Sequence, residues 1–135
     1  MSSIHHSVIA VDFDGTIVED AYPKIGKPKL FAFDTIKKLQ KNGHRIILWT
    51  VRSGKSLDKA VAFCKDKGVE FYAVNKNYPE EIVDANTPRK ILADTFIDDR
   101  NVGGFMGWDK INQLFFENES LPKIKKKNLF SFFKK

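Results

Sequence analysis

The sequence predicts an α/β fold built on a central parallel sheet, and three observations support this class. Short apolar runs rich in β-branched residues recur along the chain, and apolar residues at helical spacing lie between them. Strands that alternate with helices in this way are joined by right-handed crossovers and therefore lie parallel. The 135 residues, 42% of them hydrophobic and 30% charged, fit one globular domain.

The first predicted strand spans residues 7–11 and ends in two carboxylates, Asp12 and Asp14. Gly15 follows them, and glycine permits a turn that a β-branched residue would resist. In open α/β sheets, ligands bind where loops leave the carboxyl ends of the strands. The chemistry of this protein is therefore predicted at the end of this strand.

The middle of the chain continues the alternation of helices and strands. Apolar residues recur every three positions after residue 30, and Asn42-Gly43 is a typical helix end. A second helix stops at Lys67-Gly68. In order, the predicted elements are a helix over residues 30–42, a strand over 45–50 that ends in Thr50, a second helix, and a strand over 69–74. The turn and possible cap of the second helix lie within residues 53–56, and this helix ends at residue 67.

The last third of the chain begins with the polar residues 75–86, which are typical of a loop. Thr87 followed by Pro88 predicts a helix start, because a hydroxyl caps the helix and proline suits its first position. This short helix would have Lys90 in its first turn. The remaining predicted elements are a strand over residues 94–97, which ends in Asp98 and Asp99, and an amphipathic helix with Trp108, Ile111, Leu114 and Phe115.

Side chains able to do chemistry follow these strands or lie beside them. They are Asp12 with Asp14, Thr50, Lys90, and Asp98 with Asp99. If the strands are neighbours, these groups meet at one edge of the sheet. Clustered carboxylates repel one another unless a cation lies between them, and magnesium is the usual hard cation where phosphate is handled. A lysine and a hydroxyl nearby suit an anion, so the pattern predicts phosphoryl chemistry.

The same residues resemble the motifs of the haloacid dehalogenase-like superfamily. Residues 12–16, Asp-Phe-Asp-Gly-Thr, match its first motif, Asp-x-Asp-Gly-Thr, after an apolar strand. Thr50, Lys90 and Ile97-Asp98-Asp99 are similar to its second, third and fourth motifs, in the same order, over residues 7 to about 100. The resemblance implies a three-layer α/β/α Rossmann-like fold with a central parallel sheet. It also implies a magnesium-dependent phosphatase.

Carried over to these positions, the resemblance assigns catalysis and the metal to the aspartates. Asp12 would be the nucleophile that forms an aspartyl-phosphate, and Asp14 the general acid and then the base that activates water. Asp12, the main-chain carbonyl of Asp14, and Asp98 would hold magnesium. Asp99 would be either a further ligand or a residue that lies next to the ligands without binding the metal itself. Asp98 is favoured as the direct ligand, because side chains that alternate along a strand would point these two carboxylates in different directions.

Binding of the phosphoryl group is assigned to Thr50 and Lys90. Lys76 follows the third strand and competes for the lysine role, and Lys90 is favoured because it begins the predicted helix before the last strand. Arg52, two residues after Thr50, either reaches a second anionic group of the substrate or is a solvated loop residue.

The chain is predicted to lack the cap domain that such proteins often insert. The two gaps, residues 17–29 and 75–86, are too short for a folded domain, so the site should be open. The expected substrate is a phosphorylated small molecule or a polynucleotide end. A phosphotransferase is an alternative. A receiver-like phosphate-binding module is another, although the third predicted strand ends without the acidic residue that a receiver phosphorylates.

Charge separates a catalytic domain, residues 1–121, from a tail, residues 122–135. The net charge of +6 equals the six lysines of the tail, which has no acidic residue. Phenylalanines between these lysines predict a contact, first with protein, as in a homo-oligomer, and otherwise with a membrane surface or nucleic acid. The single cysteine, Cys64, is expected in the core. No apolar run could span a bilayer and no signal peptide is evident, so a cytoplasmic location is expected.

Overall fold

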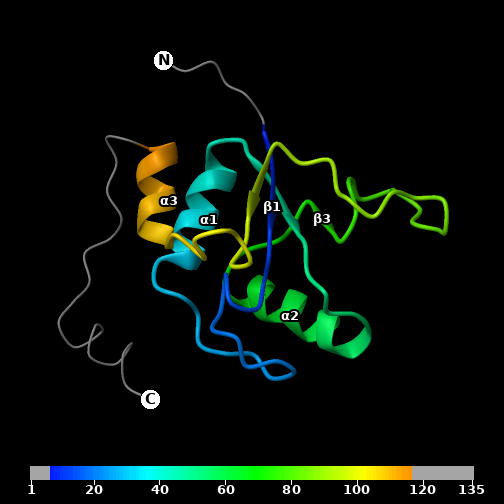
Figure 1. Ribbon diagram of the computed structural model, residues 1–135, viewed down its shortest axis with the longest axis horizontal. Coiled ribbons are helices and arrows are strands. Elements are labelled where there is room, and N and C mark those ends of the chain that lie inside the picture. The colour runs from blue at the N-terminus through cyan, green and yellow to red at the C-terminus, as the bar shows by residue number, and fades with distance from the viewer. Residues whose placement is uncertain (1–6, 117–135) are drawn as a thin grey trace.

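The computed structural model describes residues 7–116, and a parallel sheet lies at their centre (Figure 1). Within this range the strands lie in the order β3-β2-β1-β4, and every neighbouring pair is parallel. The predicted α/β class is therefore confirmed. The elements are, in chain order, β1 (Val8–Val11), α1 (Ala32–Lys41), β2 (Arg45–Leu48), α2 (Gly54–Asp66), β3 (Ala73–Val74), β4 (Thr95–Ile97) and α3 (Trp108–Phe115).

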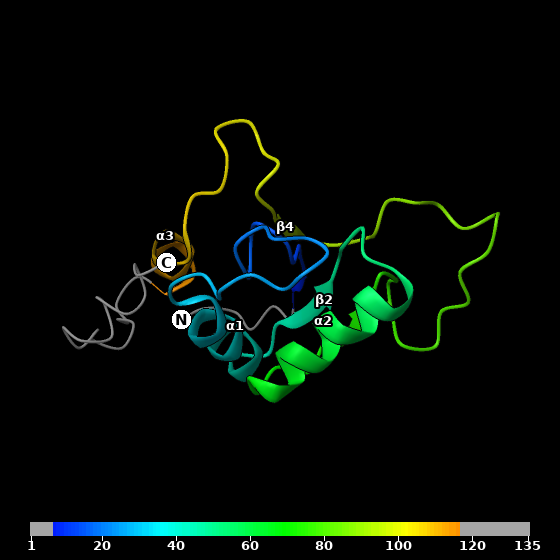
Figure 2. The same ribbon diagram turned by 90° about the horizontal axis from the view of Figure 1, so that it is seen from below.

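The three helices of the described chain lie on the same side of this sheet, as Figure 2 shows. Alternation along the strands explains this, because side chains of one parity face the helices. Ile9 and Val11 of β1 pack with Ile36 and Leu39 of α1 in one fully buried core. The helical period predicted for α1 therefore marks its buried face.

The opposite face of the sheet is covered by the irregular segment 75–94. Ala10 and Ile47 point to this face and pack with Ile91, which is only 4% exposed. The connection from β3 to β4 thus crosses the second face, as a right-handed crossover requires. The second covering layer consists of this segment, which projects sideways beyond β3 in Figure 1.

The helix predicted to begin at Thr87-Pro88 is absent, and that prediction was wrong. The Thr87 hydroxyl accepts a hydrogen bond from the Asp84 N–H (3.0 Å), so it closes a turn before it instead of capping a helix after it. The Leu92 N–H donates to Asn77 Oδ1 at 2.7 Å, which ties the segment back to its own beginning. Few residues remain before β4, too few for a stable helix without strong packing.

The third strand is also shorter than the predicted 69–74. Its pairing with β2 covers only Ala73 and Val74. The Val69 N–H donates to the Cys64 carbonyl at the end of α2 (2.9 Å), so the first of these residues completes the helix end. Cys64 itself is buried, and burial raises the pKa of its thiol to about 12, as expected for a core cysteine.

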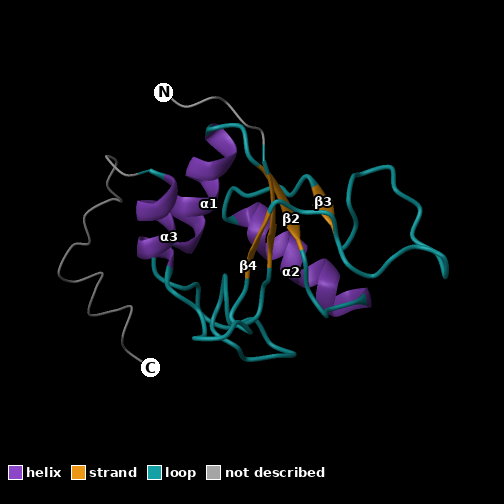
Figure 3. Ribbon diagram, turned by 45° about the horizontal axis from the view of Figure 1, so that its top comes forward, coloured by secondary structure: helices purple, strands orange, loops and turns teal. Residues whose placement is uncertain are grey.

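Several predictions concern other parts of the chain or its surroundings. The tail at residues 122–135 and the domain boundary before it lie outside the described residues. No helix in the described range has the length and apolar character needed to cross a bilayer. Neither connection predicted to be too short for a cap forms a separate domain in the described structure, and loops gather at the carboxyl ends of the strands (Figure 3).

Candidate active site

The loop that follows β1 is a tight turn. The Phe13 carbonyl accepts hydrogen bonds from the N–H groups of Ile17 (2.9 Å) and Val18 (3.2 Å), and the Gly15 N–H donates to the Val18 carbonyl (2.8 Å). Gly15 has a φ of +86°, which favours glycine, and a Cβ there would lie 2.1 Å from Asp99 Oδ2. Glycine is therefore required both by the backbone and by the aspartate packed against it.

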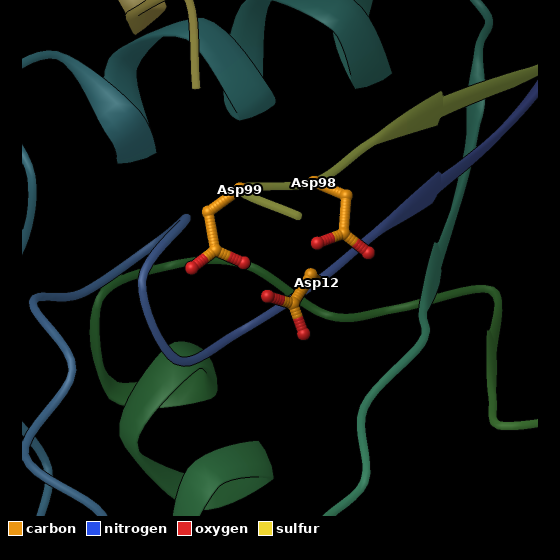
Figure 4. Close-up of side chains that lie close together, drawn as sticks. All are labelled: Asp12, Asp98 and Asp99. Carbon is orange, nitrogen blue, oxygen red and sulfur yellow. The ribbon is translucent and has the colours of Figure 1, made fainter. Parts of the chain in front are cut away.

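Three carboxylates meet beside this turn (Figure 4). Asp12 follows β1, and Asp98 and Asp99 follow β4, the neighbouring strand; the Asp12 N–H donates to the Ile97 carbonyl at 3.0 Å. One oxygen of each carboxylate lies within 4.8 Å of the others. Burial, then the charge of Asp98, then a hydrogen bond with Asp99 raise the pKa of Asp12 to about 7. The cluster therefore disfavours negative charge on Asp12 unless a cation is bound.

Asp98 and Asp99 do not point in different directions, so that prediction is wrong. β4 ends at Ile97, so the two aspartates lie beyond the strand and its alternation of side chains. Both carboxylates turn toward Asp12, as Figure 4 shows. The choice of a single direct ligand from this pair therefore loses its basis.

A metal ion fits these residues. Asp99 Oδ1 is buried and makes no hydrogen bond with the described chain, and such an atom needs a partner. The three carboxylates supply only oxygen ligands, which suit a hard divalent cation such as Mg²⁺. The main-chain carbonyl of Asp14 remains a predicted ligand.

Asp14 is held apart from this cluster by Arg52. The Nε and Nη2 atoms of Arg52 donate to the two carboxylate oxygens of Asp14, each at 2.7 Å. The remaining guanidinium N–H groups donate to the carbonyls of Pro23, Lys24 and Ser56 at 2.8 to 3.3 Å. All five donors of the guanidinium are thus used. The hydrogen bonds to Asp14 raise the pKa of Arg52.

The predicted contact of Arg52 with a second anionic group of the substrate is therefore corrected. Arg52 as a whole is 1% exposed, and its guanidinium lies between the rings of Phe13 and Tyr22, each centred 5.1 Å from the guanidinium carbon. The alternative of a solvated loop residue is wrong for the same reason. Arg52 is a buried clamp on Asp14. Sequence reasoning missed this pairing because it joins residues 38 positions apart through loop geometry.

A cavity of about 400 Å³ unites most of the predicted site residues. It is lined by Asp12, Asp14, Asp20, Tyr22, Trp49, Thr50, Val51, Asp98, Asp99 and Arg100. Neither Lys90 nor Lys76 belongs to this lining. Lys90 is exposed on segment 75–94, because the helix expected to direct it to this edge does not form. The basic residue in the lining is Arg100, which sequence reasoning missed although it directly follows the aspartate pair.

Two polar residues that sequence reasoning also missed hold the site in position. The Thr16 hydroxyl donates to Asp12 Oδ2 (3.1 Å), and Asn75 Oδ1 accepts a hydrogen bond from the Thr50 N–H (2.8 Å). The Thr50 hydroxyl accepts a hydrogen bond from the Arg52 N–H (3.2 Å), so its own hydrogen can be donated to a ligand. Thr16 could have been found from its place in the first motif, and Asn75 from its place at a strand end.

Comparisons with known proteins give one close match. A scan of protein-family models finds no match, and a search of curated proteins finds none. Among solved structures, the chain is similar to a conserved protein of Bacteroides thetaiotaomicron, with 52% identity and a TM-score of 0.78. The match covers 86% of this chain and 94% of that chain. The chain therefore belongs to the same protein family as this conserved Bacteroides protein.

Proposed function

We propose that this protein is a magnesium-dependent phosphatase of the haloacid dehalogenase-like type, which hydrolyses a phosphate monoester through an aspartyl-phosphate. The observation that carries the proposal is the pair of carboxylates in the first motif, which have different surroundings. Asp12 lies within the three-carboxylate cluster, whereas Asp14 is held outside it by Arg52. One carboxylate is thus available to a metal ion and to phosphorus, whereas the other is kept out of the metal cluster, as a separate acid and base requires.

The metal ion would be held by Asp12, Asp98 and Asp99. When bound, Mg²⁺ supplies positive charge that offsets both the carboxylates and the phosphoryl oxygens. The orphaned Asp99 Oδ1 supports this assignment. The raised pKa of Asp12, about 7, supports it too, because a buried carboxylate beside two others needs a cation to stay ionised at neutral pH.

In the first step, a carboxylate oxygen of Asp12 attacks phosphorus, and the bond from phosphorus to the ester oxygen breaks. Asp14 gives its proton to the departing oxygen. The Thr16 hydroxyl donates to Oδ2 of Asp12 and so fixes the carboxylate for this attack. The products of this step are an alcohol and a phosphorylated Asp12.

In the second step, Asp14 takes a proton from a water molecule that attacks the same phosphorus. The bond between phosphorus and Asp12 breaks, which releases inorganic phosphate and restores the carboxylate. The two hydrogen bonds from Arg52 orient Asp14 for both steps. Asp14 therefore acts from a fixed position beside the cavity.

The direct test is hydrolysis of a panel of phosphate monoesters in the presence of Mg²⁺. Wild-type protein should release inorganic phosphate, and Asp12→Asn or chelation of Mg²⁺ should reduce the rate by a factor of about 10³ or more. Asp20→Asn is the matched control, because Asp20 lines the same cavity without belonging to the cluster. Equal rates for wild type and Asp12→Asn across the whole panel would refute the proposal.

The phosphoryl charge would also be offset by a basic side chain. The resemblance assigns this role to Lys90, but Arg100 is the basic residue that lines the cavity. We propose that Arg100 has this role together with Thr50. Arg100→Gln should therefore reduce kcat/KM by about 10-fold or more, and Lys90→Gln by less. A larger loss in Lys90→Gln would return the role to the lysine.

A further inference from the structure

A second cavity of about 520 Å³ lies beside the candidate active site, between segment 75–94 and the end of the sheet. Trp49 lines this cavity and also the cavity that holds the aspartates. We propose that the second cavity binds the leaving group of the substrate and that this leaving group is nucleotide-like. It would have a planar ring that lies against Trp49 and a second anionic group that contacts Lys76 and Arg89. This inference rests on the proposed phosphatase function.

The two cavities are joined by short connections that fix their relative position. Trp49 directly follows β2, and its N–H donates to the Val11 carbonyl of β1 at 2.9 Å. Thr50, which lines the first cavity, donates its N–H to Asn75 Oδ1 at 2.8 Å, and Asn75 lines the second. A substrate whose phosphoryl group lies near Asp12 can therefore extend past Trp49 into the second cavity.

The second cavity is lined by two cations and two carboxylates, which differ in their contacts. Its acidic residues are engaged within segment 75–94: Glu81 accepts hydrogen bonds from the N–H (2.6 Å) and Nδ2 (3.1 Å) of Asn77, and Asp84 accepts one from the Asn86 N–H (2.9 Å). Lys76 and Arg89 line the same cavity, and among residues 7–116 no ion pair or hydrogen bond involves their side chains. An anionic group of a ligand can therefore pair with these two cations, whereas the carboxylates are already held by hydrogen bonds within segment 75–94.

The wall that carries these cations is anchored to the sheet. Ile91 packs in the core on the second face, and the Leu92 N–H donates to Asn77 Oδ1. Trp49 packs against the same core. A tryptophan beside two cations is a combination that recognises nucleotides, because bases stack on aromatic rings and phosphates pair with lysine and arginine.

Fluorescence of Trp49 tests this inference without turnover. The other tryptophan, Trp108, is buried with its indole N–H bonded to the Thr16 carbonyl (2.7 Å) and gives a steady background. In Asp12→Asn protein with Mg²⁺, adenosine 3′,5′-bisphosphate should quench the fluorescence and bind about 10-fold or more tightly than glycerol 2-phosphate. A Trp49→Leu variant should lose the quenching. Equal affinity for the two probes would overturn the inference.

Charge variants test the role of the two cations. Combining Lys76→Gln with Arg89→Gln should weaken binding of the bisphosphate about 10-fold and leave glycerol 2-phosphate unchanged. Combining Lys55→Gln with Lys59→Gln on α2 removes the same charge from outside both cavities and is the matched control. Equal weakening by the two double variants would overturn the inference.

Two further comparisons separate the outcomes. An oligonucleotide with a 3′-phosphate, compared with the free bisphosphate, distinguishes a nucleic-acid end from a free nucleotide as the source of the ligand. If wild-type protein hydrolyses small esters but both probes bind equally, only the second cavity is misassigned. If it hydrolyses no ester, the phosphatase proposal fails, and the fluorescence titration still tests the cavity.

Discussion

At the scale of single residues, the most completely satisfied group in the site is the guanidinium of Arg52. Its partner Asp14 has a side chain that is 12% exposed, whereas that of Arg52 is fully buried. Removing one partner of a buried ion pair leaves an uncompensated charge and typically costs about 3 to 5 kcal/mol. Because Asp14 retains some contact with solvent, the lower end of this range is expected.

Arg52→Ala should therefore lower the free energy of unfolding by about 3 kcal/mol, as measured by urea denaturation. Arg52→Lys keeps the charge but cannot form two parallel hydrogen bonds, so it should recover only part of this loss. A loss below about 1 kcal/mol for Arg52→Ala would show that the pair behaves like an exposed ion pair.

Gly15 offers a test of the contact between the first motif and Asp99. Gly15→Ala introduces strain at a positive φ, which costs about 1 to 2 kcal/mol, and also a clash with the Asp99 carboxylate. Gly103→Ala is the matched control, since Gly103 has a φ of +92° with nothing within 4 Å of the added Cβ.

The Gly15 variant should lose more unfolding free energy than the Gly103 variant, and it alone should bind Mg²⁺ more weakly in calorimetric titration. Equal effects of the two substitutions on Mg²⁺ affinity would mean that the position of Asp99 does not matter for the metal.

These residues also show which parts of the site could be predicted from the sequence. Asp12, Asp14, Thr50 and the pair Asp98-Asp99 were predictable, because polar residues at the ends of parallel strands meet at one edge of the sheet. The pairing of Arg52 with Asp14 was not, because it depends on how two loops cross. No periodicity in the sequence indicates how these loops cross.

At the scale of elements, α3 supports the loop that carries the proposed nucleophile, Asp12. Trp108, 1% exposed, donates its indole N–H to the Thr16 carbonyl at 2.7 Å, and Thr16 donates its hydroxyl to Asp12. The helix is thereby connected to the site through one buried residue.

Trp108→Phe keeps an aromatic ring in the core but leaves a buried carbonyl without its donor. We expect a loss of about 1 to 3 kcal/mol in unfolding free energy, together with weaker Mg²⁺ binding. Phe115→Leu removes an aromatic ring from the same helix without touching the loop, so it should cost stability and leave Mg²⁺ affinity unchanged. If both variants change the affinity equally, the support from α3 is general packing.

Segment 75–94 is the element that sequence predicted least well. Thr87-Pro88 has the chemistry of a helix start, yet the hydroxyl is used by Asp84, and Ile91 is fixed against the sheet. The local preference for a helix is outweighed here by side-chain hydrogen bonds that close turns and by the packing of Ile91 against the sheet. The predicted position of Lys90 depended on that helix and failed with it.

At the scale of the whole molecule, the strand order explains why the site exists. β1 lies between β2 and β4, so the ends that carry Asp12, Thr50 and Asp98 are neighbours. The parallel topology was predictable from the alternation of elements. That all three described helices lie on one face was not, because it depends on the missing helix after β3.

The stability of the metal-free protein should depend on pH through Asp12. Its pKa is raised from an ordinary value of 3.8 to about 7, so between these values the folded protein binds a proton that the unfolded chain has lost. The free energy of unfolding should therefore fall as pH rises through this window. Thermal unfolding with a chelator should show this slope in wild type and a smaller slope in Asp12→Asn.

Added Mg²⁺ should offset the loss of unfolding free energy at higher pH, because only ionised carboxylates bind Mg²⁺ well. The rise in Tm on adding Mg²⁺ should be larger above pH 7 than near pH 5. If, in the presence of chelator, the unfolding of Asp12→Asn changes with pH as steeply as that of wild type, the pH dependence belongs to other groups.

The most direct test of the proposed mechanism is capture of a phosphorylated Asp12. Asp14→Asn should still allow Asp12 to attack an aryl phosphate, whose leaving group needs no proton, but it should slow the attack of water on the intermediate. Acid quenching followed by mass spectrometry of the digested protein should then find one added phosphoryl group on the peptide that contains Asp12. Phosphate release from the aryl ester with no modified peptide, or with the modification on another residue, would contradict the account.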